Sequence, residues 1–360
     1  MNFDLTEDQV ALRDGIRSLL DGKFPMSRIR ERFDREMFDE LAEAGVFSLR
    51  TDGFGWADAA VVYEELGRAL VLEPYLSTAL VGAGILVRAG SGPHQELLRG
   101  VAAGEIRLAF AHCERDSRWR LDAVTTRAVK EGNGWVLDGS KAMVADGAGA
   151  HYLVISARTG SGISVFLLPG TSERMTRTAL TTHDGAAVAE ICLDGVRLAA
   201  DALIGAEGGG LPLIEAASEL AIAGLCAEAV GAMDALLALT LEYVKTRRQF
   251  GAPIGSFQAL QHRLAEMLLH AELARSMSYL ASARLSISDA AERRRALSAA
   301  KFLVGRSARL IGQEAVQLHG GMGVSDEVAT SHYFRRLTLL NASFGDMDHH
   351  LERFGSMMAA

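Results

Sequence analysis

Apolar positions in the first hundred residues recur at helical spacing. Thr6 and Gln9 have the spacing of a capping box, which predicts a helix that begins here. Its buried face would consist of apolar residues three or four positions apart, namely Leu12, Ile16, Leu19 and Leu20. The same pattern predicts further helices over residues 37–46, 59–70 and 74–90. We therefore expect an N-terminal helical domain, residues 1–107.

The pattern changes near Leu108, where short runs of strand-forming residues replace the helical repeat. Asn133-Gly134 is a hairpin signal between two such runs. Further strands are predicted over residues 108–114, 152–159, 163–169 and 189–198. Several short strands at close spacing indicate a middle β domain, a small sandwich or barrel, over residues 108–200.

Helical spacing returns after residue 200. It predicts long helices over residues 211–247, from 256 onward, over 295–318 and over 330–357. Four long helices favour a four-helix bundle as the C-terminal domain, residues 201–360. The predicted fold class is therefore α+β and mostly α. The connection at 199–210 holds four glycines, but no βαβ unit surrounds them, so we interpret it as a linker and not as a dinucleotide loop.

Composition narrows the possible functions. Lys and Arg number 37 against 45 Asp and Glu, a net charge of −8, which disfavours nucleic-acid binding. Three scattered cysteines suit neither a disulfide framework nor a zinc site. The most apolar segment, 211–244, is interrupted by five acidic residues, which favours a buried helix over a membrane span. The first residues are acidic where a signal peptide would be basic, so we expect a cytoplasmic protein.

One candidate binding segment lies where a long predicted helix ends. Arg247, Gln249 and Phe250 stand at this end and in the turn that follows. An arginine guanidinium can donate to two phosphate oxygens at once, so Arg247 could anchor a pyrophosphate beside the next helix. The simpler alternative is an arginine that balances the dipole at a helix end.

A second candidate segment follows the third long predicted helix. Gln317 can both donate and accept hydrogen bonds, and Gly320 and Gly321 let the backbone approach a ligand closely. The simpler alternative is a glycine pair that ends a helix.

Together the segments RRQFGAPIGSFQALQ (247–261) and QLHGGMG (317–323) resemble the acyl-CoA dehydrogenase family. The resemblance covers nearly the whole chain and implies a helical, a β and a four-helix-bundle domain in that order. It also implies FAD, oxidation of an acyl-CoA thioester at its α–β bond to the trans-enoyl-CoA, and transfer of electrons to an electron-transfer flavoprotein. Most such enzymes are tetramers in which the adenine end of each FAD lies on a neighbouring subunit.

The resemblance assigns roles to the two segments by position. Arg247, with Gln249 and Phe250, matches the contacts to the FAD phosphates. Gln317, Gly320 and Gly321 match the contacts on the adenosine side. These six residues are therefore the candidate cofactor-binding residues.

The catalytic base departs from the family pattern. The usual glutamate falls on Phe344, and the alternative base position on the preceding long helix falls on Ala221; neither side chain accepts a proton. Two carboxylates are weak candidates: Asp346, which is nearest to the usual site, and Glu228, which shares the helix face of Ala221 but lies about 10 Å further along the axis. A helix N-cap is the simpler interpretation for Asp346, and a buried, hydrogen-bonded glutamate is the simpler one for Glu228.

A metal site is an alternative for the carboxylate near the chain end. Asp346, His349 and His350 are spaced to share a helix face. The family uses no metal, so we expect a capping or solvated cluster and no bound metal.

The segments expected near a flavin ring also depart from the pattern. The stretch at 111–122 has no glycine, and the usual tryptophan and threonine fall on Met143 and Ala145. The ending at 344–354 is similar to the small subunits of heteromeric acyl-CoA dehydrogenases of pimeloyl-CoA and sterol side-chain breakdown.

Two function hypotheses follow. In the first, the chain is an FAD-dependent acyl-CoA dehydrogenase or one subunit type of such an enzyme. In the second, it is a non-catalytic structural subunit of a heterotetramer with a paralogous dehydrogenase chain. An oxidase that passes electrons to oxygen is a third possibility. The acyl group stays open among short-chain, dicarboxylyl and steroid groups, and so does a homomeric or heteromeric tetramer.

Overall fold

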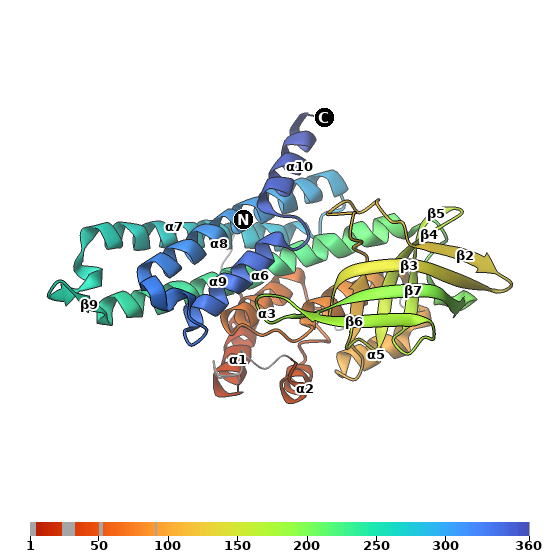
Figure 1. Ribbon diagram of the computed structural model, residues 1–360, viewed down its shortest axis with the longest axis horizontal. Helices are drawn as coiled ribbons and strands as arrows, with labels where there is room; N and C mark the ends of the chain where they lie inside the picture. The colour runs from red at the N-terminus through yellow and green to blue at the C-terminus, as the bar shows by residue number, and fades with distance from the viewer. Residues whose placement is uncertain (1–4, 24–32, 50–52, 91, 360) are drawn as a thin grey trace. The chain divides into compact units, whose positions relative to one another are not determined.

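The computed structural model describes residues 5–23, 33–49, 53–90 and 92–359. Its packing forms two compact units. The helical unit comprises Met1–Arg30, Gly55–Val71 and Ile222–Ala360, and the sheet unit comprises Glu31–Phe54 and Leu72–Ala221. The order of helices, strands and helices along the chain follows the prediction (Figure 1).

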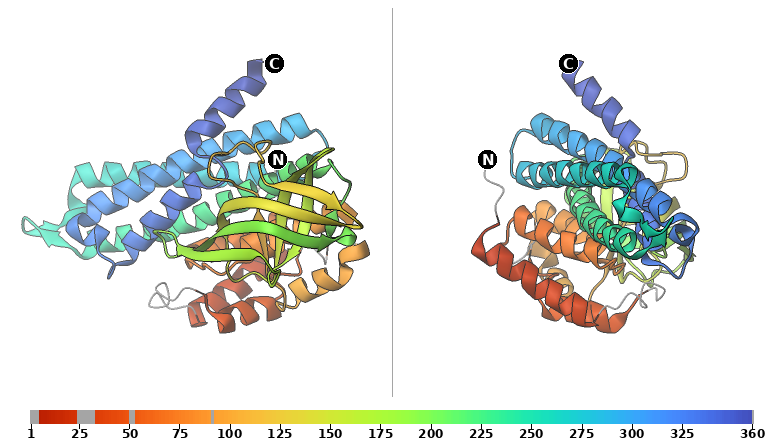
Figure 2. Two further views of the ribbon diagram at one scale, coloured as in Figure 1. Left: turned by 45° about the vertical axis from the view of Figure 1, so that its right-hand side comes forward. Right: turned by 90° about the vertical axis from the view of Figure 1, so that its left-hand side faces the viewer.

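Seven helices with described residues contribute to the helical unit: α1 (Glu7–Lys23), α3 (Trp56–Arg68), α6 (Gly210–Thr246), α7 (Gln258–Arg284), α8 (Ala290–His319), α9 (Ala329–Ala342) and α10 (Met347–Ala359). Between them lie the hairpin strands β9 (Arg248–Gln249) and β10 (Ala252–Pro253) and the 3₁₀ turns η5 (Ile254–Ser256) and η6 (Gly320–Val324). Helix α8 packs against α7, α9 and α10, as Figures 1 and 2 show.

The predicted start of α1 is confirmed. The backbone N–H of Gln9 donates to Thr6 Oγ1 at 3.2 Å, and that of Thr6 donates to Gln9 Oε1 at 3.1 Å. Glu65 of α3 then joins α1 to α3, because its buried carboxylate accepts from Arg17 at 2.6 Å and from Arg68 at 2.7 Å.

Helices α3 and α6 approach each other so closely that two glycines are required. A Cβ at Gly67 would lie 2.0 Å from the carbonyl oxygen of Glu228, and a Cβ at Gly231 would lie 1.8 Å from that of Glu64. Each helix thus places a glycine against the backbone of the other. Helix α6 is long and apolar enough to span a membrane by length and composition, but 78% of its apolar window is buried inside the structure, as in a core helix.

The last predicted helix, over 330–357, is wrong as a single helix, because the chain breaks between α9 and α10. Phe344 and Gly345 adopt positive φ angles of 54° and 101°, which no α-helix can contain. Asp346 then starts α10, since its carboxylate accepts the backbone N–H of His349 at 2.8 Å.

Among its described residues, the sheet unit has eight strands: β1 (Leu108–Ala111), β2 (Arg127–Glu131), β3 (Gly134–Ala145), β4 (Tyr152–Thr159), β5 (Gly162–Pro169), β6 (Met175–Thr181), β7 (Ala187–Ala199) and β8 (Leu203–Ile204). Its helical segments are α2 (Arg35–Glu43), the π-helical η2 (Leu76–Gly82), α4 (Ala83–Gly90), the 3₁₀ turn η3 (Gly92–His94), α5 (Gln95–Ala102) and the 3₁₀ turn η4 (Ala200–Ala202), together with the start of α6. The sequence did not predict α5, β6 or the two-residue strand β8, which lies in the segment interpreted as a linker.

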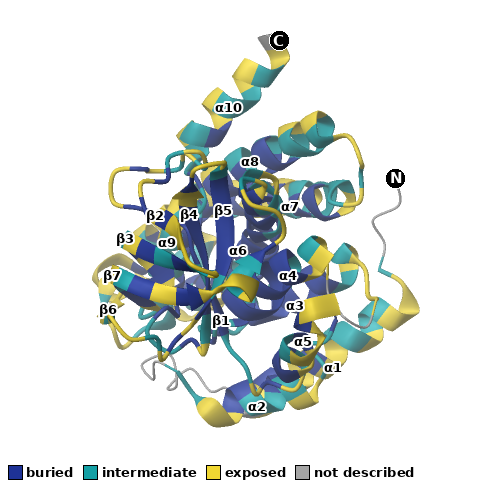
Figure 3. Ribbon diagram, turned by 90° about the vertical axis from the view of Figure 1, so that its right-hand side faces the viewer, coloured by how far each residue is buried: buried dark blue, intermediate teal, exposed yellow. Residues whose placement is uncertain are grey.

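The strands form one sheet in the order β6-β7-β3-β2-β4-β5-β8, and β1 pairs with β4 in parallel. Strands β4 and β5 are buried along most of their length (Figure 3). The predicted hairpin joins β2 to β3, but its turn lies one residue earlier than expected. Glu131 pairs with Gly134, so Gly132 and Asn133 form the turn, and Gly132 has the positive φ of 59° that such a turn favours.

The glycine-rich connection at 199–210 packs against β5. A Cβ at Gly208 would lie 2.4 Å from the carbonyl oxygen of Ser161, and one at Gly210 would lie 2.8 Å from that of Ile163. Close backbone packing therefore accounts for these glycines, in agreement with their interpretation as a connection.

Candidate functional site

The first candidate segment forms an exposed hairpin at the end of α6. The backbone N–H of Arg247 still donates to Tyr243, so Arg247 closes the last turn of the helix. Within the described residues, the Arg247 side chain has no ion pair or hydrogen bond. Phe250 stands at the hairpin tip with a φ of 52° and 92% of its surface exposed, beside Phe257 at 6.1 Å between ring centroids. Packing within the described residues does not explain this exposed ring, which is available for contact with another molecule.

The second candidate segment forms η6 after α8. Gly320 ends the helix at a φ of 62°, which a glycine adopts without strain. At both Gly320 and Gly321 an added Cβ would meet nothing within 4 Å, and both residues are exposed, as is Gln317. Packing inside the described chain therefore does not require a glycine at Gly321. The open space above this backbone is available to a ligand or another subunit.

Apolar side chains flank this open backbone. Met322 is 49% exposed and Val324 66% exposed, both in η6. Exposed apolar side chains therefore accompany both candidate segments: Met322 and Val324 stand beside the glycine pair, and Phe250 stands in the hairpin that follows Arg247. An exposed ring close to an unpaired guanidinium suits a ligand with a planar ring and an anionic part.

The turn at the family's base position keeps a defined backbone. Phe344 accepts a hydrogen bond at its carbonyl from His350 Nε2 at 3.0 Å, and Gly345 lies against the two histidine rings, where a Cβ would be 2.6 Å from His349. Buried Lys301 donates to the carbonyls of Leu340 and Asn341, both at 2.8 Å, and so holds the end of α9. The hydrogen bonds of Lys301 and His350 thus go to backbone carbonyls at the end of α9 and in the turn, and none goes to the side chain at 344.

The two weak base candidates are engaged elsewhere. Asp346 is the N-cap of α10. Glu228 is buried, and its carboxylate accepts from Arg336 of α9 at 2.6 Å. Asp346 is therefore placed as a helix N-cap and Glu228 as a buried, hydrogen-bonded glutamate, the simpler interpretation of each residue. In the part of the chain that the structure describes, no group of three or more His, Cys, Asp or Glu side chains is placed to hold a metal.

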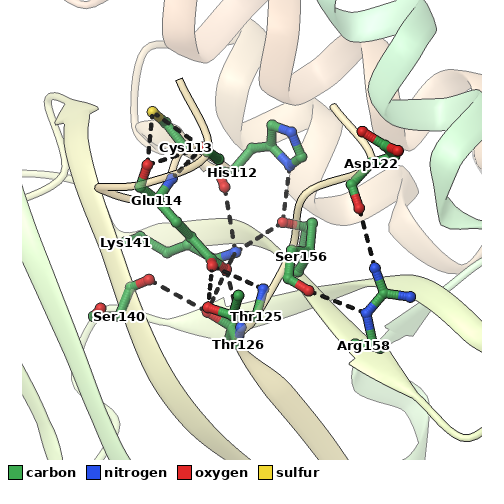
Figure 4. A network of polar contacts seen from close by, with 12 residues as sticks. His112, Cys113, Glu114, Asp122, Thr125, Thr126, Ser140, Lys141, Ser156 and Arg158 are labelled. Atoms are coloured by element: carbon green, nitrogen blue, oxygen red, sulfur yellow. Dashed lines mark hydrogen bonds and ion pairs between the residues drawn. The ribbon is translucent and has the colours of Figure 1, made fainter. Parts of the chain in front are cut away.

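In the sheet unit, the segments expected near a flavin ring share one buried polar network (Figure 4). Lys141 of β3 has no exposed surface, and its ammonium donates to Glu114 Oε1 at 2.7 Å, to Ser156 Oγ at 3.0 Å and to the His112 carbonyl at 3.3 Å. All three of its donors are used. Sequence reasoning missed this pair, because Glu114 lies in the loop after β1 and Lys141 lies in a strand that also carries Asp138, so no local pattern sets either residue apart.

Glu114 joins the start of the loop after β1, residues 112–126, to its end. Its carboxylate accepts backbone N–H groups from Thr125 at 2.8 Å and from Thr126 at 3.0 Å, as well as both threonine hydroxyls. Burial alone would raise the pKa of Glu114, but the hydrogen bonds from Lys141 and Thr125 outweigh it and lower that pKa to about 2. Burial likewise lowers the pKa of Lys141 to about 8, against the effect of Glu114.

The same network sets the bulge in β3. The register between β3 and β7 shifts between Lys141 and Val144, the backbone N–H of Ala142 donates to the Cys113 carbonyl at 2.8 Å, and Met143 adopts a φ of 53°. Met143 is 52% exposed and Ala145 is also exposed. The positions that match the flavin-contacting tryptophan and threonine therefore face outward, but neither present side chain supplies an aromatic ring or a hydroxyl.

Comparison with known proteins agrees with this geometry. The family models for the N-terminal, middle and C-terminal domains of acyl-CoA dehydrogenases match residues 6–105, 109–196 and 208–357. The chain belongs to the acyl-CoA dehydrogenase family, whose members are oxidoreductases that act on CH–CH bonds of acyl-CoA. The predicted fold class is thereby confirmed.

Among individual relatives, the chain is 28% identical to acyl-CoA dehydrogenase FadE27 of Mycobacterium tuberculosis, over 100% of this chain and 99% of the relative. It is 28% identical to the probable acyl-CoA dehydrogenase YngJ of Bacillus subtilis, over 96% of each chain. A solved chain of the ChsE4–ChsE5 complex from Mycobacterium tuberculosis matches with a TM-score of 0.89 and 27% identity, over 100% of this chain and 99% of that chain.

Proposed function

We propose that this chain is the non-catalytic subunit type of a heteromeric, FAD-dependent acyl-CoA dehydrogenase. It lends the surface around Arg247 and Gly320-Gly321 to the FAD of a paralogous subunit that carries the glutamate base. The observation that supports this most is the contrast between the two parts of the helical unit: the adenosine-side surface is open and unpaired, whereas the base position holds Phe344 in an intact turn.

The residues present fit one end of FAD. The Arg247 guanidinium would bind pyrophosphate oxygens, and Gln249 would add a polar contact beside it. Phe250 offers an exposed ring, and the open backbone at Gly320 and Gly321 leaves room for the adenosine. The ring end has no equivalent support in this chain, because Met143 and Ala145 replace the tryptophan and threonine.

The chemistry of dehydrogenation assigns different roles to the two subunit types. Bound FAD would accept the hydride that leaves the β-carbon of the acyl group. Removal of the α-proton needs a carboxylate within hydrogen-bond reach, and Phe344 offers none. This chain therefore binds and orients, and the partner's carboxylate moves the proton.

Several features support a partner subunit. ChsE4–ChsE5 is by its name a complex of two components. Three leucines on the outside of α7 are exposed, namely Leu268 at 52%, Leu269 at 59% and Leu273 at 41%. Apolar side chains gathered on one exposed helix surface are typical of a contact between subunits. We infer a tetramer in the cytoplasm, with an acyl-CoA substrate and an electron-transfer flavoprotein as the acceptor.

The test is to purify the chain alone and co-expressed with a paralogue that has glutamate at the base position. We expect a colourless protein alone, and in the complex an amount of flavin that matches the partner chain. Arg247→Ala in the complex should lower flavin retention roughly tenfold or more, since a charged hydrogen bond contributes about 1.5–3 kcal/mol.

Lys245→Ala is the matched control, because Lys245 lies on the same helix end but pairs with Glu242 at 2.8 Å. It should leave flavin retention unchanged. Flavin bound by the chain alone together with dehydrogenation of any acyl-CoA would contradict the proposal and favour a homomeric enzyme. Full flavin retention by Arg247→Ala would equally contradict the proposed surface.

A further inference from the structure

Two side chains outside the assigned site lie between its two segments. Tyr243 is one turn before Arg247 on α6, and its carbonyl accepts the backbone N–H of Arg247 at 2.8 Å. His319 directly precedes Gly320. The two rings stack with their centroids 4.3 Å apart and their planes 22° apart, and the tyrosine hydroxyl donates to the His319 carbonyl at 3.4 Å.

His319 also closes the loop that carries the glycine pair. Its Nδ1 lies 2.8 Å from the Ala315 carbonyl of α8, and its Nε2 lies 3.2 Å from Thr330 Oγ1 of α9. A carbonyl can only accept, so Nδ1 carries the proton and Nε2 accepts from the threonine hydroxyl. Burial lowers the pKa of His319, which keeps the ring neutral as this arrangement needs.

The loop between these anchors is tightly folded back. A Cβ at Gly323 would lie 2.8 Å from the Val316 carbonyl and 3.1 Å from His319 Cβ. The loop is thus fixed to the last turn of α8, and the imidazole of His319 joins its start to its end. Through the stack with Tyr243, the whole loop is fixed to the last turn of α6.

We propose that Tyr243 and His319 are positioning residues that set the separation between the Arg247 guanidinium and the Gly320-Gly321 backbone. This inference rests on the proposed function, in which one ligand spans both segments. A ligand that bridges two rigid segments gains both contacts only when their separation matches its own length. Disturbing the stack therefore weakens the contact to Arg247 as well as the contact to the glycines.

The test uses the co-expressed complex and measures the dissociation constant of FAD, with the melting temperature recorded in parallel. Tyr243→Leu and His319→Leu should each weaken FAD binding roughly tenfold, in line with one lost charge-assisted contact. Tyr243→Phe keeps the ring and should bind FAD almost as tightly as the unmodified chain. Tyr243→Leu combined with Arg247→Ala should lose little more than Arg247→Ala alone, because both act on one contact.

Glu65→Gln is the control for stability, since it weakens the contact between α1 and α3 and touches neither segment. It should lower the melting temperature and leave FAD affinity unchanged. Thr330→Val removes only the hydroxyl that His319 Nε2 accepts, and it should weaken FAD binding in the same direction if His319→Leu does not assemble.

The positioning role would be overturned if the losses in FAD-binding free energy of Tyr243→Leu and Arg247→Ala added in full in the double variant. So would a Tyr243→Leu complex with a lower melting temperature and unchanged FAD affinity. If the Arg247→Ala complex bound FAD with unchanged affinity, this would instead contradict the proposed binding surface itself, and the positioning role would fall with it.

Discussion

Gly231→Ala is expected to prevent stable folding of the helical unit. The added Cβ would lie 1.8 Å from the carbonyl oxygen of Glu64, 2.7 Å from its carbonyl carbon and 2.9 Å from the backbone nitrogen of Arg68. These are backbone atoms of a packed helix, so no side-chain rotation can relieve the overlap. Helices α3 and α6 would have to separate, at a cost of roughly 3 kcal/mol or more. This is a large part of the 5–15 kcal/mol by which a typical domain is stable.

Urea unfolding followed by circular dichroism measures this cost. Gly67→Ala should behave in the same way, since its Cβ would lie 2.0 Å from the Glu228 carbonyl. Gly15→Ala is the matched control: Gly15 is an exposed helical glycine with nothing within 4 Å, and its replacement should stabilise α1 slightly. A Gly231→Ala protein as stable as the Gly15→Ala protein would show that the two helices do not cross as described.

The second large effect is expected for Lys141→Met in the sheet unit. Methionine fits the space of the lysine stem but leaves the Glu114 carboxylate buried without its cation, which costs about 3–5 kcal/mol. Replacing both partners, as Lys141→Met with Glu114→Gln, should recover part of this loss because no buried charge remains. A single variant that is as stable as the double variant would contradict this account.

The pH dependence of the same pair has a defined sign. Because the pKa of Glu114 is about 2 when folded and 4.5 when unfolded, its stabilising contribution is complete above pH 4.5 and is lost as the pH falls toward 2. The stability difference between the unmodified protein and Lys141→Met should therefore shrink over this range. Urea midpoints measured at pH 7 and at about pH 3 test this.

Glu64 gives an effect of opposite sign, because its burial destabilises the folded protein. Its carboxylate is 16% exposed, one oxygen has no hydrogen-bond partner among the described residues, and the other lies 3.6 Å from Arg275, which binds Asp234 more closely. Burial, despite Arg275, raises the pKa of Glu64 from 4.5 to about 8. Folding therefore costs progressively more as the pH rises from 4.5 to 8, and Glu64→Gln should stabilise the protein by roughly 4 kcal/mol at pH 8 and little at pH 4.5.

The neighbouring Glu65→Gln is the control for that variant. Glu65 accepts from Arg17 and Arg68, so its loss should destabilise the protein at pH 8. Thermal melts of both variants at pH 4.5 and pH 8 provide the comparison. Equal shifts for the two variants would rule out the burial of Glu64 as the cause.

Local signals in the sequence predicted much of the fold. The capping pair Thr6 and Gln9 and the apolar run of β4, residues 152–159, identify their elements because the relevant contacts lie within a few residues. Strand β6 was missed because it pairs on one side only, with β7, and its residues are mostly exposed, so no apolar alternation marks it. The break between α9 and α10 was missed because apolar spacing continues across it.

The candidate site was predictable only in part. Its positions came from motif resemblance, but exposure of Phe250 and the open backbone at Gly320 are properties of the folded chain. The pairing of Glu228 with Arg336 joins residues 108 apart, and no local pattern indicates it. The same is true of Glu114 and Lys141, which are 27 residues apart.

The turn at Phe344 has a consequence for how a subunit of this kind can arise. Its positive φ is maintained through backbone contacts, from His350 to the Phe344 carbonyl and from Lys301 to the end of α9. The side chain at 344 takes no part in these hydrogen bonds, so substitution at this one position can exchange a proton acceptor for an aromatic ring without refolding the turn. A duplicated gene can thus lose the chemistry while its product keeps the shape that an assembly requires.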